Sequence, residues 1–461
     1  MAAHNGRILN SVVYSQPGSQ VKTDLSSSLT PIISEEDFLP LVQKECQTFL
    51  AVLRFLRNEK ITVNKFYYFT LMQEAERLEA FLDDHAARAN LRWLFFSELV
   101  ACVRNFSLAG FHLLHVLDRY SDYLGGNRDS IRGDFEKESR DTIDYFPEVL
   151  GRFYEELLNE ASNQGIEARE VSVPTEAWRV EATPHLPYTV YSDNSSDETE
   201  RIISIAQSYR RTLKVFKQHR LHRKIKTKDL SKIIPSKLNE RLMDELESYL
   251  HNIQSEYDTH IRGSKTEKSN QWVITLRGLT AIPMHLFEFL EWLVHFYERH
   301  ERHGRVNEES GVKNRISGLV DHDRLLACIV DFALYYCNRY LTEGNEVAER
   351  ILSMYVDPIT CKLPLPKPQG FHARPSTYVS LIVQEHGTDV FMSVGGKDFN
   401  CRSVLELIEA GGLLADMNAK SALFKGDKRS LDDLKILAEH NYCEEEDIPA
   451  ELGYLKILRN L

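Results

Sequence analysis

The chain has 461 residues, 43% of them hydrophobic, and a formal net charge of −12. A single hydrophobic core stops growing at about 250–300 residues, so this length predicts more than one domain. The negative charge argues against nucleic-acid binding by the whole chain, because duplex binding needs clustered Lys and Arg. Seven scattered cysteines without a CxxC pair favour free, buried thiols in a reducing cytoplasm over disulfides or a zinc site.

The first 33 residues are rich in Ser, Thr, Gln and Gly and show no hydrophobic period. This composition predicts a disordered arm over residues 1–33. The segment lacks the basic start and continuous apolar core of a signal peptide. No stretch of the chain approaches the roughly 20 apolar residues of a membrane span, so we expect a cytoplasmic protein without one.

Helical patterns dominate from Ser34 to about Tyr355, giving a large all-α region. Ser34 followed by three acidic residues is typical of a helix start. The expected helices cover residues 36–57, 64–85, 88–122, 130–162, 198–225, 236–263, 272–303 and 321–355. Three prolines and a Ser/Asp cluster predict a connector over 171–197, which separates helical regions 34–170 and 198–355.

Two sets of carboxylates and histidines in the helical regions raise the question of a metal site. One expected helix carries Glu288, Glu291, His295, Glu298 and Arg302 along a stripe; upstream ranges carry Glu74, Glu79, Asp83, His85, Glu98, His112 and His115. Di-metal bundles use a repeated Glu-x-x-His spacing, which is absent here. Mixed stripes are typical of ion-paired helix faces, so we assign no metal ligands. A helical metal-binding protein is kept as an alternative.

The run from Arg201 to Lys237 contains twelve Lys or Arg residues and one acid, Asp229. It is either a solvated or ion-paired helix, for example with the acidic residues 244–248, or a binding surface. Few aromatic residues interrupt the run, which favours a protein partner over nucleic acid.

The pattern changes after Val356. Gly395-Gly396 separates two short β-prone runs within 388–403, which predicts a hairpin. Residues 403–412 read as a short helix with Ser403 as N-cap, and 430–442 as a final amphipathic helix. The order strand, helix, strand, strand, helix, weak strand, helix predicts a small α+β domain over 356–443, followed by a C-terminal tail over 444–461.

The stretch PQGFHARPST (368–377) combines residues suited to an anion. Pro375 fits the first turn of a helix, where its missing N–H group costs nothing. His372 then lies just before the helix N-terminus, where free N–H groups and the helix dipole attract negative charge. Neutral imidazole is a nucleophile near pH 7, and the Arg374 guanidinium suits phosphate oxygens. Such a histidine can also be an ordinary surface or capping residue.

Residues 356–443 resemble the histidine-containing phosphocarrier protein HPr of the bacterial phosphotransferase system. The resemblance rests on Gly370 and the HARP motif His372–Pro375, the hairpin around Gly395-Gly396-Lys397, CRSVLEL (401–407) and LDDLKILAEHNY (431–442), in the family's order. It implies an open-faced four-stranded antiparallel sheet with three helices. It covers none of the helical regions, and the typical carrier stands alone rather than at the end of a longer chain.

The resemblance implies a role for each matching residue. His372 matches the phospho-acceptor, Arg374 the arginine that contacts phosphate, and Ser376 and Thr377 residues that supply first-turn N–H groups. The phosphodonor would be an enzyme I-like protein, and no cofactor is implied.

A second set of matches lies at the start of the following helix. Ser403 matches a serine that a dedicated HPr kinase phosphorylates in part of the family, although its position equally suits a plain helix cap. Val404, Leu405 and Ile408 match the apolar docking patch beside it.

The chain departs from the family pattern in two places. Pro364, Pro366 and Pro368 lie in or next to the first expected strand, which is tolerable only at a sheet edge. The fourth strand, within 415–427, alternates poorly and has few β-branched residues.

We therefore expect an HPr-family phosphocarrier or regulatory protein, in which His372 accepts a phosphoryl group and passes it on or regulates the helical region. This would be transferase-like phosphohistidine chemistry rather than turnover catalysis. The alternative is a scaffold whose HPr-like domain only docks partners, with other protein partners bound by the helical region.

Overall fold

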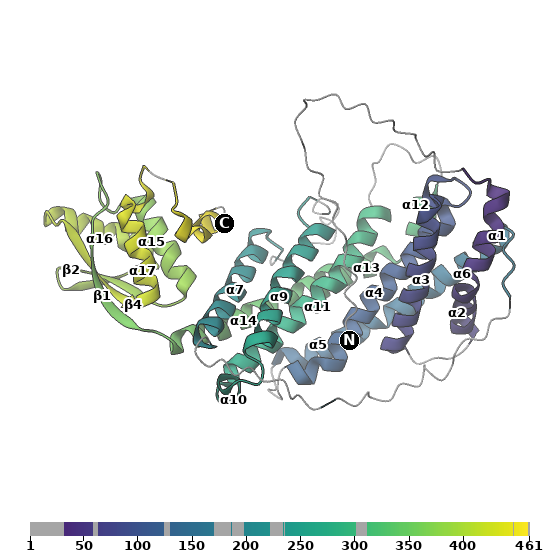
Figure 1. Cartoon of the computed structure of the whole chain (residues 1–461), viewed down its shortest axis with the longest axis horizontal. Coiled ribbons are helices and arrows are strands. Elements are labelled where there is room, and N and C mark those ends of the chain that lie inside the picture. Colours follow the sequence, from purple (N-terminus) through teal and green to yellow (C-terminus); the bar gives the residue numbers. More distant parts are fainter. Residues whose placement is uncertain are drawn as a thin grey trace, which may run out of the picture.

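The computed structural model describes residues 32–58, 63–123, 130–169, 186, 198–221, 234, 236–300, 311–445 and 447–459. Over these residues the chain is mostly helical, with a small antiparallel sheet at its C-terminal end (Figure 1). This confirms the expected helical part followed by a smaller α+β part. The expected arm lies almost wholly outside the described residues, as does the expected connector except for Leu186.

The helices of the large part fall within the expected ranges or in short stretches between them. Their bounds are α1 (Glu35–Glu45), α2 (Gln47–Asn58), α3 (Lys65–Asp84), α4 (Leu94–Tyr123), α5 (Ser130–Ile143), α6 (Tyr145–Asn163), α7 (Glu198–Gln218), α9 (Glu240–His260), α10 (Lys265–Ser269), α11 (Gln271–His300), α12 (Val312–Ser317), α13 (His322–Ala327) and α14 (Tyr335–Met354), with a π-helical stretch, Cys328–Leu334, between the last two and a 3₁₀ turn at Ala87–Ala89.

The helix starts follow from capping residues in the sequence. The Ser34 hydroxyl accepts a hydrogen bond from the backbone N–H of Asp37 (3.1 Å), as its position before the acidic run predicts. The side chain of Asn239 caps α9 in the same way, accepting from the N–H of Leu242 at 2.8 Å. Each cap satisfies an N–H group that the helix itself leaves unpaired.

Two expected helices are interrupted: 36–57 at Cys46, between α1 and α2, and 130–162 at Asp144, where α5 ends and α6 begins. Pro147 explains the second interruption. It has no N–H group to donate to the carbonyl of Ile143, and its ring crowds the preceding turn. The prediction of one continuous helix was therefore wrong at both positions.

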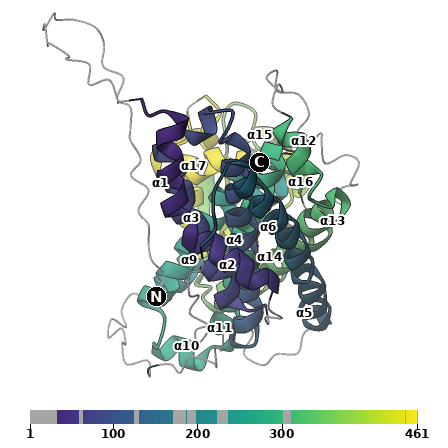
Figure 2. The same ribbon diagram turned by 90° about the vertical axis from the view of Figure 1, so that its right-hand side faces the viewer.

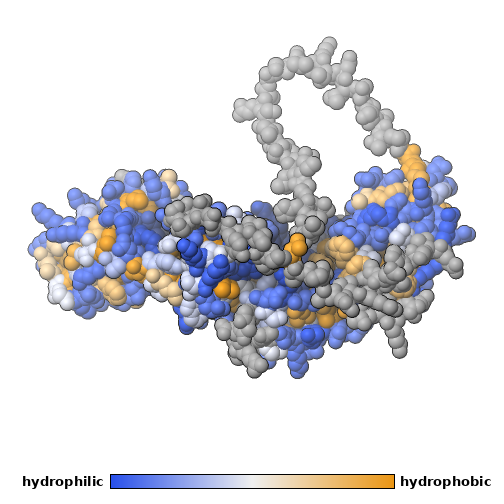
Figure 3. Space-filling model, turned by 60° about the horizontal axis from the view of Figure 1, so that its bottom comes forward, coloured by the Kyte–Doolittle hydropathy of each residue, from blue (hydrophilic) through white to orange (hydrophobic). Residues whose placement is uncertain are grey.

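Helices α4 and α11 lie side by side in the middle of the helical part, among α3, α6, α9 and α14 (Figure 2). The two backbones approach closely: a Cβ atom added at Gly278 would come within 1.7 Å of the carbonyl oxygen of Tyr123. Both helices are long and apolar enough to cross a membrane, but 72% and 78% of their most apolar windows are buried in the protein. Burial of this extent is typical of core helices. The face shown in Figure 3 is mostly hydrophilic, with hydrophobic side chains in small separate patches.

All seven cysteines are free, and six of them are buried. Burial raises the pKa of the Cys46 thiol and of the Cys328 thiol to about 12. Cys361, which is half-buried at the edge of the sheet, is the exception. The expectation of free, mostly buried thiols is confirmed.

The α+β part contains four strands and three main helices. Their bounds are β1 (Pro358–Pro364), α15 (Ala373–His386), β2 (Val390–Val394), β3 (Lys397–Asn400), α16 (Val404–Asp416), β4 (Ser421–Asp427) and α17 (Lys428–Glu439). The sheet is antiparallel with strand order β1-β4-β2-β3. In its register Phe424 pairs with Cys361 on one side and with Met392 on the other. The expected order of elements is confirmed.

The three helices cover one face of this sheet (Figure 1). The α+β part has an apolar core of its own, distinct from that of the helical part. Alternate residues of the strands, among them Met392 and Phe424, point into this core, while Phe391 and Leu423 are exposed on the opposite face. Strand β1, which begins and ends with proline, is an edge strand. This is the position in which proline is tolerated, because one side of the strand needs no partner.

Residues beyond the expected end of the α+β part, Cys443, also pack on it. They form a 3₁₀ turn, Ala450–Leu452, and the short helix α18 (Tyr454–Arg459), which contacts α15. Leu452 and Leu455 are fully buried in the same core as the sheet residues. The segment expected as a tail therefore completes this core.

Candidate functional site

His372 stands at the N-cap position of α15, and its side chain makes no capping hydrogen bond. Gly370 adopts a φ of +70°, a left-handed conformation that glycine reaches without strain, and turns the chain into the helix. Phe371 is buried against the rings of Phe424 and Tyr442 and fixes the loop. The imidazole is consequently held at the helix N-terminus with 35% of its surface exposed.

A carboxylate that was not predicted from the sequence lies against this imidazole. Oε1 of Glu444 is 3.0 Å from Nε2 of His372, and the Glu444 side chain is only 11% exposed. The backbone carbonyl of Glu444 accepts a hydrogen bond from the Arg374 guanidinium at 2.7 Å. His372 and Arg374 thus meet around one residue, Glu444.

An unusual turn places Glu444 in this position. Asn441, Tyr442 and Cys443 have φ values of 46°, 57° and 55°, in the left-handed region that residues other than glycine rarely adopt. The Asn441 side chain hydrogen-bonds both the N–H and the carbonyl of Lys367, at 2.8 Å each. These contacts hold three consecutive strained residues, and such strain gathers at functional sites.

Arg374 is exposed, and within the described residues its guanidinium donates one hydrogen bond, to the carbonyl of Glu444. A guanidinium has five N–H donors, so most of its donors are available to an added anion. Positive charge of this kind beside a helix N-terminus favours phosphate.

Ser376 and Thr377 lie in the first turn of α15, and some of their polar groups already have hydrogen-bond partners within the helix. The N–H of Ser376 faces the carbonyl of His372 at 3.2 Å, and its buried hydroxyl has no hydrogen-bond partner in the described part of the chain. The hydroxyl of Thr377 donates to the carbonyl of Ala373 at 2.7 Å.

Ser403 caps α16, as expected, and its hydroxyl accepts from the N–H of Glu406 at 3.2 Å. Leu405 is 79% exposed and Ile408 37% exposed, while Val404 is half-buried. Leu413 of the same helix and Met417, its C-cap residue, are exposed as well. The expected docking residues are therefore the first of several exposed apolar side chains along α16.

Helix α16 also touches the loop that carries His372. A Cβ atom added at Gly411 would come within 2.6 Å of the carbonyl oxygen of Phe371. The absence of a side chain at Gly411 lets α16 approach this loop, so the helix that Ser403 caps packs directly against the segment that positions His372.

The opposite end of α15 contacts the helical part. Glu385 is 2% exposed, and its carboxylate pairs with Arg211 and, at 3.1 Å, with Lys214 of α7. Its carbonyl accepts from Arg210 at 2.8 Å. Burial alone would raise the pKa of Glu385, but Lys214 and Arg211 hold this pKa below its usual value.

These contacts explain part of the basic run. Arg210, Arg211 and Lys214 bind Glu385, and Arg201 lies 3.4 Å from Glu256. Residues 222–233 and 235 of the run lie outside the described residues. Four of its described basic side chains thus make contacts within the chain.

Several members of the carboxylate and histidine stripes are likewise paired with neighbours. Glu79 binds Arg88 and Arg104, and His295 lies 2.7 Å from Glu240. This supports the interpretation of ion-paired helix faces for these residues. Glu288 differs, because two histidines converge on it.

Comparisons with models of protein families, with curated proteins and with solved structures find no match to this chain. Glu444 and His285 were not among the residues predicted from the sequence. The run of acids directly after Cys443 was a signal for the first, and the spacing His285-x-x-Glu288 for the second.

Proposed function

We propose that residues 356–443, together with the packed segment after them, form an HPr-like phosphocarrier domain and that His372 is its phospho-acceptor. The main support is the position of the imidazole, exposed at the N-terminus of α15 beside Arg374. The order of strands and helices that the resemblance implies also agrees with the observed order. In this proposal the large helical part is a separate domain of the same chain.

The contact with Glu444 leaves the imidazole able to act as a nucleophile. Nε2 of His372 lies 3.0 Å from Oε1 of Glu444, and this oxygen has no hydrogen-bond partner among the described residues, so the two atoms are close without a formed hydrogen bond. The neutral imidazole keeps a lone pair on one ring nitrogen. During transfer, a bond forms from that nitrogen to phosphorus as the bond between phosphorus and the donor breaks. Arg374 and the helix N-terminus would then stabilise the added charge.

Repulsion by the Glu444 carboxylate would also favour release of the phosphoryl group from His372. A phosphoryl group carries nearly two negative charges at pH 7, and here it would stand near a carboxylate of low exposure. Attraction by Arg374 and repulsion by Glu444 would oppose one another. A carrier needs this balance, because it must both accept the group and release it.

The distance along α15 bears on how the phosphoryl group would act. The helix has 14 residues, which at about 1.5 Å per residue gives about 21 Å between His372 and the contact with α7. Exposed charges are screened beyond about 8 Å at physiological ionic strength. The phosphoryl charge would therefore act through a docked protein, using the exposed apolar side chains of α16, rather than directly on α7.

The partners that follow are an enzyme I-like donor and a protein acceptor or target. An HPr kinase acting on Ser403 would be a further partner in this proposal. Such a donor works in the cytoplasm, which is where we place the protein. The net charge of −12 supports protein partners over nucleic acid.

Incubation of the full chain with a bacterial enzyme I and labelled phosphoenolpyruvate tests the proposal. We expect acid-labile label that is absent from His372→Ala. His219→Ala, which alters a histidine of the helical part, serves as control and should be labelled like the parent. A parent chain that takes up no label would favour the alternative, a scaffold that only docks partners.

A further inference from the structure

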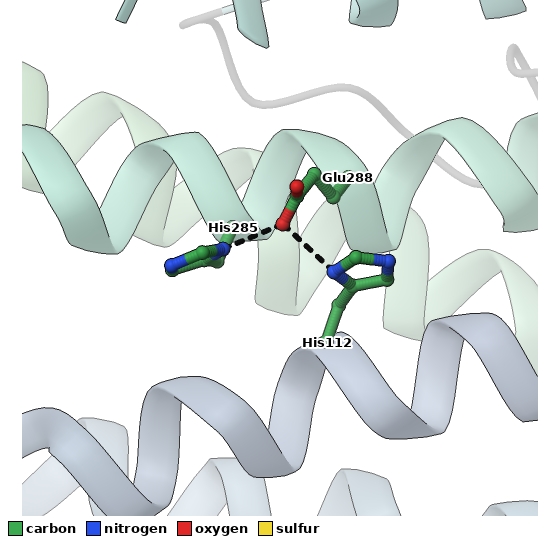
Figure 4. A group of neighbouring side chains, drawn as sticks. All are labelled: His112, His285 and Glu288. Carbon is green, nitrogen blue, oxygen red and sulfur yellow. Dashed lines mark hydrogen bonds and ion pairs between the residues drawn. The ribbon is translucent and has the colours of Figure 1, made fainter. Parts of the chain in front are cut away.

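Three side chains of the two central helices converge at one point between them. His112 comes from α4, and His285 and Glu288 come from α11 (Figure 4). Nδ1 of His112 lies 2.7 Å from Oε2 of Glu288, and Nδ1 of His285 lies 2.5 Å from the same oxygen. The three potential ligand atoms are all within 4.8 Å of one another.

The donor set has the chemistry of a transition-metal site. Two imidazole nitrogens and one carboxylate oxygen are ligands that Zn²⁺ accepts, at about 2.0–2.2 Å, with a further position open to water. Ligands at these distances around a tetrahedral ion stand slightly more than 3 Å apart, so a small rotation of the side chains would admit the ion. The exposed fractions of 18%, 13% and 23% leave solvent a path to the site.

The surroundings orient one of the two imidazoles. The ring of His115 packs edge-on against the ring of His285, with centroids 4.5 Å apart. Nδ1 of His115 lies 2.8 Å from Nζ of Lys65, and its Nε2 lies 3.3 Å from the hydroxyl of Tyr123. The fixed ring of His115 therefore restricts the rotation of the His285 imidazole.

Further carboxylates stand near the site. Burial and the charges of Glu288 and Asp244 raise the pKa of Glu247, on the neighbouring helix α9, to about 7. Glu291 contributes to the same effect, and His112 opposes it. A divalent cation placed beside Glu288 would offset this repulsion, whereas an anion would increase it.

We propose that His112, His285 and Glu288 bind one divalent transition-metal ion of the Zn²⁺ type, through Nδ1 of each histidine and a carboxylate oxygen. The inference is independent of phosphoryl transfer at His372. Three protein ligands leave an open position, which could take water or an oxygen ligand of a small molecule.

Metal titration of the full chain tests this inference. The purified chain is stripped with a chelator and titrated with Zn²⁺ in competition with a chromophoric indicator, and Co²⁺ is added separately to record its visible absorption. We expect one ion per chain and the absorption bands of a Co²⁺ ion of low coordination number. His285→Gln and Glu288→Gln preserve size and should weaken binding by about 100-fold or more, since even outer partners of metal ligands contribute about 10–100-fold.

The chain offers a matched control on the same helix. His295 pairs with Glu240 at 2.7 Å and is as little exposed as His285, but within the described part of the chain no third His, Cys, Asp or Glu completes a ligand set with them. His295→Gln should therefore leave Zn²⁺ binding unchanged. Circular dichroism establishes that each variant is folded, and Glu288→Asp replaces Glu288→Gln if that variant is not. Absence of saturable binding by the parent would overturn the inference, as would equal binding by the parent and the folded site variants.

Discussion

Gly411 of α16 lies directly against Phe371, the residue that precedes His372: a Cβ atom at Gly411 would be 2.6 Å from the Phe371 carbonyl oxygen. Gly411→Ala should therefore push α16 away from the His372 loop. We expect a loss of about 1–3 kcal/mol in the free energy of unfolding, because backbone atoms cannot yield easily. Phosphorylation of His372 should also be slower.

The next residue provides the control for this change. Gly412 is in the same helix, and a Cβ atom there meets nothing within 4 Å. Gly412→Ala should stabilise the protein by about 0.5–1 kcal/mol through helix propensity. Chemical denaturation of both variants measures the difference, and equal stabilities would show that the contact at Gly411 is not tight.

Arg374→Lys should slow phosphorylation of His372 while leaving the fold intact. A guanidinium holds phosphate through two donors in a fixed plane, and an ammonium group does not. In the parent the Arg374 side chain donates to a backbone carbonyl at the exposed surface, so stability should change little. Rates of label uptake with enzyme I give the comparison. A rate equal to that of the parent would mean that Arg374 does not contact the phosphoryl group.

Ser403→Ala should cost about 0.5–2 kcal/mol, because it removes the oxygen that accepts from the N–H of Glu406. Ser403→Asp should remain folded, since a carboxylate at a helix N-terminus is favourable. It places charge beside Leu405, which is 79% exposed, and a charge at the edge of an apolar contact hinders docking. Phosphorylation of His372 should therefore be slower in Ser403→Asp than in Ser403→Ala. Two variants labelled as fast as the parent would reduce Ser403 to a helix cap.

Glu385→Gln should destabilise the protein by about 1–3 kcal/mol at pH 7, because it breaks the charged hydrogen bonds to Arg211 and Lys214. The pKa of Glu385 is lower in the folded chain than its usual value, so this stabilisation is complete above about pH 4.3 and is lost as the pH falls through the folded pKa. The difference between parent and variant should hence shrink from pH 7 to pH 3.

Glu349→Gln is the control for this pair. Glu349 also contacts α7, through Arg210 at 3.2 Å, but 40% of its side chain is exposed. Its loss should cost less than about 1 kcal/mol. Thermal and denaturant unfolding at each pH supply the values, and a pH-independent difference for Glu385→Gln would contradict the assigned ion pairs.

The helices were predictable because a 3.6-residue period persists over long ranges, and caps such as Ser34 and Ser403 mark their starts. The fourth strand was difficult for a physical reason. It is central in the sheet, and Gly426 is required by crowding rather than by β-propensity: a Cβ atom there would be 2.7 Å from the side chain of Val390. A strand composition set by its neighbours leaves a weak local signal.

The residues of the candidate sites also differ in how well the sequence predicts their positions. His372, Arg374 and Ser403 stand at helix starts, so local sequence places them. Glu444 reaches His372 only through a turn of three left-handed residues, which no spacing rule predicts. The meeting of His112 with His285 depends on how α4 crosses α11, and this is decided by packing of the whole helical part.

The different burial of the thiols lets cysteine modification report local and global unfolding separately. Six cysteines are buried in the two cores, and Cys361 sits half-buried on edge strand β1. A thiol reagent added to the native protein should modify Cys361 first, at a rate set by local loosening of the edge. The other six should react only as the cores open, so a single modification time course separates fraying of the sheet from unfolding of the chain.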